Sequence, residues 1–195
     1  MNNFKSNPIF QVADELLPEE VTALKNYKDL AYDLNAFLRG NKVLVSPDPI
    51  QYRQLDSAIR KSRVLKPIRL FRATFAEDFD RFVRDGIFHD PAYASTSLSE
   101  SNLGGHFVSE CSKRPIKLVI SCPQGANAFY LELANDSGEA ENECLLPRCG
   151  RYRIDTERSP VTETRAMAEA MGQNNCYHAQ GFDALRIIEL SLLVS

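Results

Sequence analysis

The spacing of apolar residues changes once along this 195-residue chain, and the change limits the folds that the chain can adopt. Before Pro67, apolar residues recur every three or four positions, as they do on one face of a helix. From Ile68 onwards, short β-rich stretches take their place. Helices followed by strands, without regular strand–helix alternation, predict an α+β fold and argue against a parallel doubly wound sheet.

The helical part contains two predicted helices. Proline at the first helical position and acidic residues in the first turn favour a helix that begins at Pro18, and Gly40 is a natural end for it. The second predicted helix begins at Asp48 and Pro49 and runs to about Ser62. Residues 1–17 are expected to form an N-terminal arm or a short helix.

The remaining segments are expected to be mainly strands. Predicted strands cover residues 68–75, 92–98, 115–122, 128–133, 144–146, 151–155 and 184–194, and predicted helices cover residues 77–84 and 163–171. The length suits one domain that spans residues 1–195, with a core of its own.

Composition excludes several classes of protein. A formal net charge of −3 provides no overall basic surface for nucleic acid. The five cysteines are odd in number and lack a C-x-x-C pair, which argues against a metal site and a disulfide framework and fits a reducing cytosol. No apolar run approaches the roughly 18 residues of a membrane span. Residues 1–8 do not resemble a signal peptide, so delivery by a dedicated secretion system is expected.

Two groups on predicted strands and one on the first predicted helix stand out as candidate functional residues. Arg72 continues the face formed by Ile68 and Leu70, so it points where an apolar residue is expected and needs an anionic partner. Ser95 and Ser97 share one face of the next predicted strand. On the first helix, Tyr32, Asn35 and Arg39 follow the apolar stripe at helical spacing, which on spacing alone is typical of a polar flank on a surface helix.

The stretch around residue 141 carries two carboxylates, Glu141 and Glu143. If a strand covers this stretch, a side-chain period of two places Glu141, Glu143 and Leu145 on one face. Acidic pairs on strands most often form the solvated side of a sheet, although two carboxylates on one face also suit acid–base chemistry.

Together these pieces resemble the mono-ADP-ribosyltransferases of the Arg–Ser–Glu class, which include clostridial binary toxins and Rho-modifying exoenzymes. The matching segments are D-L-N-A-F-L-R-G at 33–40, L-F-R-A at 70–73, Y-A-S-T-S-L-S at 93–99, G-G-H-F at 104–107 and E-N-E-C-L-L-P-R at 141–148. The resemblance implies N-terminal helices followed by two packed, mostly antiparallel sheets around a cleft for NAD⁺, with no metal.

The resemblance also implies roles for particular residues. Arg72, with Arg39 and Asn35 on the helix, would bind the NAD⁺ diphosphate, and Phe107 would stack on the nicotinamide. The Ser-Thr-Ser strand, Ser95, Thr96 and Ser97, would line the cofactor site, with Ser95 positioning the catalytic carboxylate.

The two glutamates would divide the reaction between them. Glu143 would act on the ribose of NAD⁺, while Glu141 would bind the acceptor, which the resemblance implies is an arginine of a target protein.

Other functions remain open from the sequence. An NAD⁺ glycohydrolase and a non-catalytic NAD-binding module would carry the same motifs. A Rossmann dehydrogenase lacks support because G-x-G-x-x-G is absent. The histidines do not fit the transferase class that places a histidine where Arg72 stands. A glycosidase could use both glutamates but would not require Arg72.

The expected setting is a bacterial toxin or effector that acts in a target-cell cytoplasm, and an antibacterial role would add an immunity protein as a partner.

Overall fold

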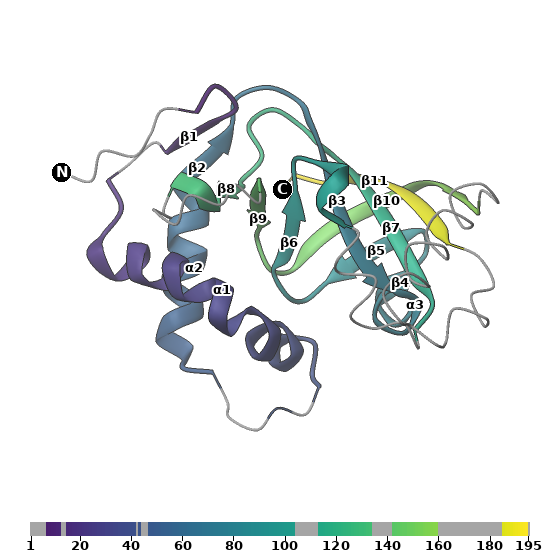
Figure 1. The fold of residues 1–195 in the computed structure, drawn as a ribbon, viewed down its shortest axis with the longest axis horizontal. Coiled ribbons are helices and arrows are strands. Elements are labelled where there is room, and N and C mark those ends of the chain that lie inside the picture. The colour runs from purple at the N-terminus through teal and green to yellow at the C-terminus, as the bar shows by residue number, and fades with distance from the viewer. Residues whose placement is uncertain are drawn as a thin grey trace.

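The structure of the protein is a computed structural model, which describes residues 7–12, 15–41, 43, 47–103, 113–133, 142–159 and 185–194. The helices are α1 (Pro18–Leu38), α2 (Pro49–Arg60) and α3 (Ala76–Phe79), with short 3₁₀ turns η1 (Asp80–Phe82), η2 (Glu100–Leu103) and η3 (Leu131–Leu133). The strands are β1 (Phe10–Val12), β2 (Ser62–Val64), β3 (Ile68–Phe75), β4 (Val83–Arg84), β5 (Ile87–Asp90), β6 (Ala94–Ser97), β7 (Pro115–Cys122), β8 (Phe129–Tyr130), β9 (Glu143–Leu146), β10 (Gly150–Arg158) and β11 (Arg186–Leu192). Figure 1 shows α1 and α2 together on one side of the molecule, beside the strands.

Helix α1 has the boundaries that the sequence predicts. The Glu20 carboxylate accepts a hydrogen bond from the Leu17 amide at 2.7 Å and so caps the first turn. At the other end, Gly40 has a φ of 75° and its amide donates to the Phe37 carbonyl at 2.9 Å. A glycine in the left-handed region allows the helix to stop without strain, so Gly40 fixes the point where α1 ends.

Helix α2 also begins where the sequence predicts. The Asp48 side chain accepts a hydrogen bond from the Ile50 amide at 2.8 Å, which is the geometry of an N-cap. The two helices pack through one apolar cluster that includes Leu24 and Tyr27 of α1 and Leu55 and Ile59 of α2. This pairing forms a compact helical layer next to the sheet.

The α+β class is confirmed, and most of the described strands form one mixed sheet. Nine strands follow the order β4-β5-β10-β11-β7-β3-β6-β9-β8, and β1 and β2 pair separately. Strands β11 and β7 are parallel, whereas the other pairs described are antiparallel. The two sheets of the prediction are therefore two halves of one hydrogen-bonded sheet.

The two halves meet at a weak junction between β3 and β6. Strand β3 pairs with β7 over eight positions, from Ile68 to Phe75. Its pairing with β6 is limited to Phe71 opposite Ser97. Few main-chain hydrogen bonds therefore join the two halves of the sheet at this junction.

Several local predictions were wrong. The predicted helix over residues 77–84 ends early, because Val83 and Arg84 pair with β5 in a hairpin whose turn contains Asp85 and Gly86 at positive φ. Strands β1, β2 and β5 were not predicted, and the segment 128–133 is a two-residue strand followed by a 3₁₀ turn. The predicted helix over residues 163–171 lies outside the described residues. In the part of the chain that is described, no helix has the length and hydrophobicity to cross a membrane.

Gly40 provides a test of the helix boundary. A Cβ at this position would meet no heavy atom within 4 Å, so the only cost of Gly40→Ala is the left-handed backbone. We expect the free energy of unfolding to fall by about 1–2 kcal/mol, measured by urea denaturation. Gly40→Asn should lose less, because asparagine tolerates this conformation. Equal stability of the alanine variant and the parent would contradict the assignment.

Candidate active site

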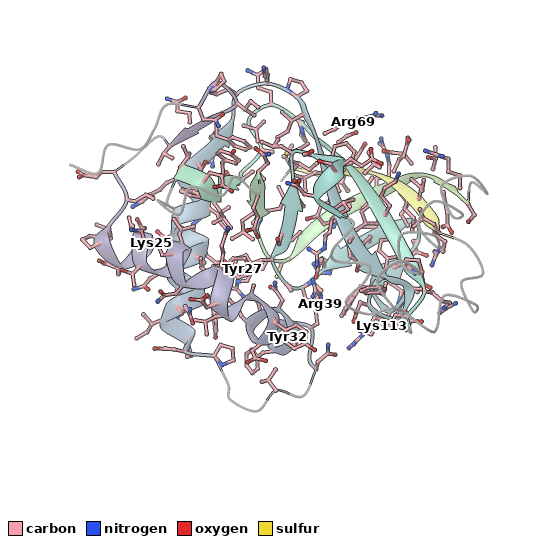
Figure 2. All side chains as sticks on the ribbon, viewed as in Figure 1. Lys25, Tyr27, Tyr32, Arg39, Arg69 and Lys113 are labelled. Carbon is pink, nitrogen blue, oxygen red and sulfur yellow. The ribbon has the colours of Figure 1, made fainter. Side chains whose placement is uncertain are left out.

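A cavity of about 730 Å³ lies between α1 and the β3–β6 junction of the sheet. Its described lining comes from α1, β3, α3, β6, η2 and β9, with Asn41 and Lys113 from loops. Figure 2 shows Arg39 where the end of α1 approaches the strands. The residues that the sequence singled out on these elements, Asn35, Arg39, Arg72, Ser95, Thr96, Ser97 and Glu143, all line this cavity.

Ser95 and Glu143 form a hydrogen-bonded pair at the base of the cavity. In the β6–β9 register, Ser97 is opposite Glu143 and Ser95 is opposite Leu145, so Ser95 and Glu143 are diagonal neighbours on one face. The Ser95 hydroxyl donates to Glu143 Oε1 at 2.5 Å. Lys28 on α1 has its Nζ 3.9 Å from the other carboxylate oxygen, Oε2. The carboxylate is therefore held from two sides.

Arg72 points inward from β3, as its position after Leu70 predicts. Its side chain is only 13% exposed. Its Nη1 donates a long hydrogen bond, 3.4 Å, to the Tyr93 carbonyl and lies 3.7 Å from Asp90 Oδ2. Burial lowers the pKa of Arg72, and the positive charge of Arg39 lowers it further.

Arg39 is bound in a fork by Asp90, a residue that the sequence analysis missed. Arg39 Nε and Nη2 donate to the two Asp90 oxygens at 3.1 and 2.9 Å. Asp90 also accepts the Ala92 amide at 3.0 Å. Burial alone would lower the pKa of Arg39, but the charge of Asp90 and its hydrogen bonds outweigh that effect and raise it. The sequence offered no signal for Asp90, because β5 itself was not predicted.

Asn35 is occupied by contacts within the protein. Its Nδ2 donates to the Tyr27 hydroxyl at 2.9 Å, and its Oδ1 accepts the Tyr93 amide at 3.2 Å. Burial is the main cause that raises the pKa of Tyr27 to about 12. Asn35 thus fastens α1 to the residue that precedes β6, while also lining the cavity.

The hydroxyls next to Ser95 are occupied as well. Thr96 is buried, and its hydroxyl donates to the Cys144 carbonyl at 2.6 Å, so this group is used within the sheet. Ser97 Oγ accepts the Ser99 amide at 3.0 Å and the Asn102 side-chain amide at 3.3 Å. These bonds shape the turn after β6.

Two predicted site residues, Phe107 and Glu141, lie outside the described residues. Strand β9 begins at Glu143, and the preceding Asn142 has a φ of 53°, in the left-handed region. The side-chain period of two therefore does not apply before Glu143. The position of Glu141 relative to Glu143 therefore stays a prediction.

The charge of the described lining favours an anion. The cations Lys28, Arg39, Arg72 and Lys113 line the cavity, against the carboxylates Asp78 and Glu143. The sequence analysis missed Lys28, Lys113 and Asp78, because contact across the cavity leaves no local pattern. Among the described residues, no group of three or more histidine, cysteine or acidic side chains is placed to hold a metal ion. The arrangement combines an anion receptor with an oriented carboxylate.

Several solved structures have the same fold. Plx2a, an ADP-ribosyltransferase toxin of Paenibacillus larvae, is 20% identical with a TM-score of 0.64, over 92% of this chain and 88% of that one. BECa, an ADP-ribosylating toxin of C. perfringens solved with NADH, is 17% identical with a TM-score of 0.68, over 93% of this chain and 45% of that one. The Clostridium limosum C3 exoenzyme is 22% identical with a TM-score of 0.60, over 92% of this chain and 87% of that one.

The family assignment comes from sequence. A search of curated proteins finds no match. The family model described as ADP-ribosyltransferase exoenzyme matches residues 1–175, which is most of the chain. The chain therefore belongs to the ADP-ribosyltransferase exoenzyme family.

Proposed function

We propose that this protein is a mono-ADP-ribosyltransferase of the toxin or effector type, which transfers ADP-ribose from NAD⁺ to an arginine of a target protein and releases nicotinamide. The observation that carries the proposal is the Ser95–Glu143 pair, at 2.5 Å, in the same cavity as the inward-pointing Arg72. Family membership supports the reaction type, and the relative BECa was solved with NADH.

Binding of NAD⁺ relies on the cationic part of the cavity. Arg72 presents a buried guanidinium, and a planar guanidinium makes paired, charge-assisted bonds to phosphate oxygens. Low exposure to water strengthens such bonds, because the local dielectric is lower than in bulk solvent. Arg39 adds positive charge to the same side of the cavity. We assign the diphosphate to this region.

Glu143 is the catalytic carboxylate in this proposal. Cleavage of the nicotinamide–ribose bond develops positive charge on the ribose, as glycoside cleavage does. A carboxylate that is already oriented stabilises this charge without reorganising, which lowers the barrier. The hydrogen bond from Ser95 keeps the Glu143 carboxylate in one orientation. Lys28, on the other side, balances its charge before the substrate enters.

The acceptor assignment rests on the sequence at Glu141. In the family that the chain resembles, glutamate two residues before the catalytic glutamate accompanies modification of arginine. A carboxylate pairs with a guanidinium and assists removal of its proton, so Glu141 suits that acceptor. Without an acceptor, water would take the same place and the protein would hydrolyse NAD⁺.

The proposed setting is a target-cell cytoplasm, reached through a dedicated delivery system. Several solved proteins with this fold are described as toxins. Of the five cysteines, Cys122, Cys144 and Cys149 lie in the described residues and are free thiols, which is compatible with a reducing compartment. Labelling a lysate with tagged NAD⁺ and identifying the modified band would reveal the target.

Arg72→Ala tests the NAD⁺ site. Removal of the guanidinium should weaken NAD⁺ binding by about 1.5–3 kcal/mol, the contribution of a hydrogen bond to a charged group, as measured by calorimetry. Arg69→Ala is the matched control, because Arg69 lies on the same strand but is exposed. It should bind NAD⁺ like the parent. An unchanged dissociation constant for Arg72→Ala would remove Arg72 from the site.

Glutamine variants of Glu143 and Glu141 test whether the two glutamates have different roles. Glu143→Gln keeps the shape of the side chain and loses its charge, so kcat for both transfer and NAD⁺ hydrolysis should fall by about 10²–10³-fold. Glu141→Gln should retain much of the hydrolysis, because water needs no carboxylate to pair with a guanidinium, while transfer to arginine falls steeply. The measurement is nicotinamide release with and without a protein acceptor.

Two results would contradict this division. Complete loss of hydrolysis in Glu141→Gln would show that Glu141 also acts on the bond that breaks. Undiminished transfer to arginine in Glu141→Gln would show that the acceptor does not depend on its charge.

A further inference from the structure

Asp90 is buried between the two arginines of the cavity. Its side chain is 2% exposed, and its carboxylate oxygens bind Arg39 through two donors. Oδ2, which accepts the shorter of these bonds, also lies 3.7 Å from Arg72 Nη1. Asp90 ends strand β5, in the other half of the sheet from β6, and the Ala92 amide fixes its Oδ1. One carboxylate therefore contacts both guanidiniums from a fixed position.

The two arginines differ in the hydrogen-bond donors that remain available to a ligand. Arg39 uses Nε and Nη2 for Asp90. Arg72 engages only Nη1, at the long distances of 3.4 Å to Tyr93 and 3.7 Å to Asp90. Within the described part of the chain, Arg72 Nε and Nη2 make no hydrogen bond. Arg72 thus has a pair of donors available on one edge of its guanidinium, and Arg39 has a single nitrogen.

The two buried guanidiniums need a compensating negative charge to be stable in this arrangement. Both guanidiniums are largely buried, with side chains 15% and 13% exposed, and like charges repel more strongly where water is excluded. An uncompensated charge in such a place is strongly destabilising. Asp90 compensates one of the two, so the pair retains one net positive charge for an incoming anion.

We propose that Asp90 is a positioning residue that holds Arg39 as a support and keeps Arg72 directed into the cavity as the principal ligand of the NAD⁺ diphosphate. The inference deepens the proposed function and rests on it. Asp90 does not touch the reacting atoms in this scheme. It acts through the geometry and charge of the two arginines.

The proposal predicts that Asp90→Asn changes the NAD⁺ affinity in the direction opposite to that expected from charge alone. A carboxylate close to a diphosphate repels it, so by charge alone Asp90→Asn would strengthen NAD⁺ binding. If Asp90 positions the arginines, Asp90→Asn weakens binding, because asparagine cannot accept both bonds of the fork from Arg39 and leaves two buried cations without their shared anion. The dissociation constant for NAD⁺ should rise on the order of tenfold or more, the effect of losing a hydrogen bond to a charged group.

The first experiment measures NAD⁺ binding by calorimetry and NAD⁺ hydrolysis kinetics on Asp90→Asn. We expect KM to rise much more than kcat falls, because Glu143 and Ser95 are untouched. Glu20→Gln is the matched control. Glu20 is also a buried carboxylate, 2% exposed and paired with Lys61, and neither residue lines the cavity. Glu20→Gln should lower stability and leave the dissociation constant unchanged.

A second variant separates positioning from a loss of folding. In Arg39→Met/Asp90→Asn both charges of the pair are removed, so the repulsion on Arg72 disappears. If Asp90 acts through Arg39, Asp90→Asn should cost less NAD⁺ affinity in the Arg39→Met background than in the parent. An equal loss of affinity in the two backgrounds would overturn the proposal.

If Asp90→Asn does not fold, two charge-preserving variants decide the question. Arg72→Lys should lose far more NAD⁺ affinity than Arg39→Lys, because only Arg72 has a pair of donors available. An equal or reversed loss would overturn the proposal, as would Asp90→Asn binding as tightly as the parent. A parent protein that binds no NAD⁺ would instead overturn the proposed function itself.

Discussion

The weak pairing between β3 and β6 determines the architecture of the site. Strand β3 is paired along its whole length on one side and at a single position, Phe71 opposite Ser97, on the other. Arg72 on β3 and Ser95 on β6, on the two sides of this junction, line a common cavity. The site therefore lies where few main-chain hydrogen bonds join the two halves of the sheet.

The helical layer is fixed to this junction by buried polar contacts. Asn35 joins Tyr27 of α1 to the Tyr93 amide, just before β6. The Tyr93 hydroxyl donates to Asp56 of α2 at 2.7 Å, and Arg148 binds the same carboxylate through Nε and Nη2. Satisfied networks of this kind hold elements in a single arrangement. They hold α1, which forms one wall of the cavity, against the start of the strand that carries Ser95.

Electrostatics then distinguishes the two ends of the cavity. On one side of the cavity the Ser95 hydroxyl orients the Glu143 carboxylate, and Lys28 lies 3.9 Å from its Oε2. At the other end two buried guanidiniums share one carboxylate, which leaves a net positive charge. Such charges act strongly because they are shielded from water. A substrate with a diphosphate and a ribose that becomes positively charged matches both ends.

The sequence by itself determined the α+β class, both long helices and the strand that carries Arg72, because helix caps, Gly40 and the period of apolar residues act locally. It also pointed to Ser95 and Glu143, through motifs on single strands. Only the tertiary structure revealed that Asp90 joins Arg39 to Arg72, that Lys28 faces Glu143, and that the predicted helix after β3 becomes a hairpin. These features depend on contacts between residues far apart in the chain, which create burial and charge pairing that no local pattern encodes.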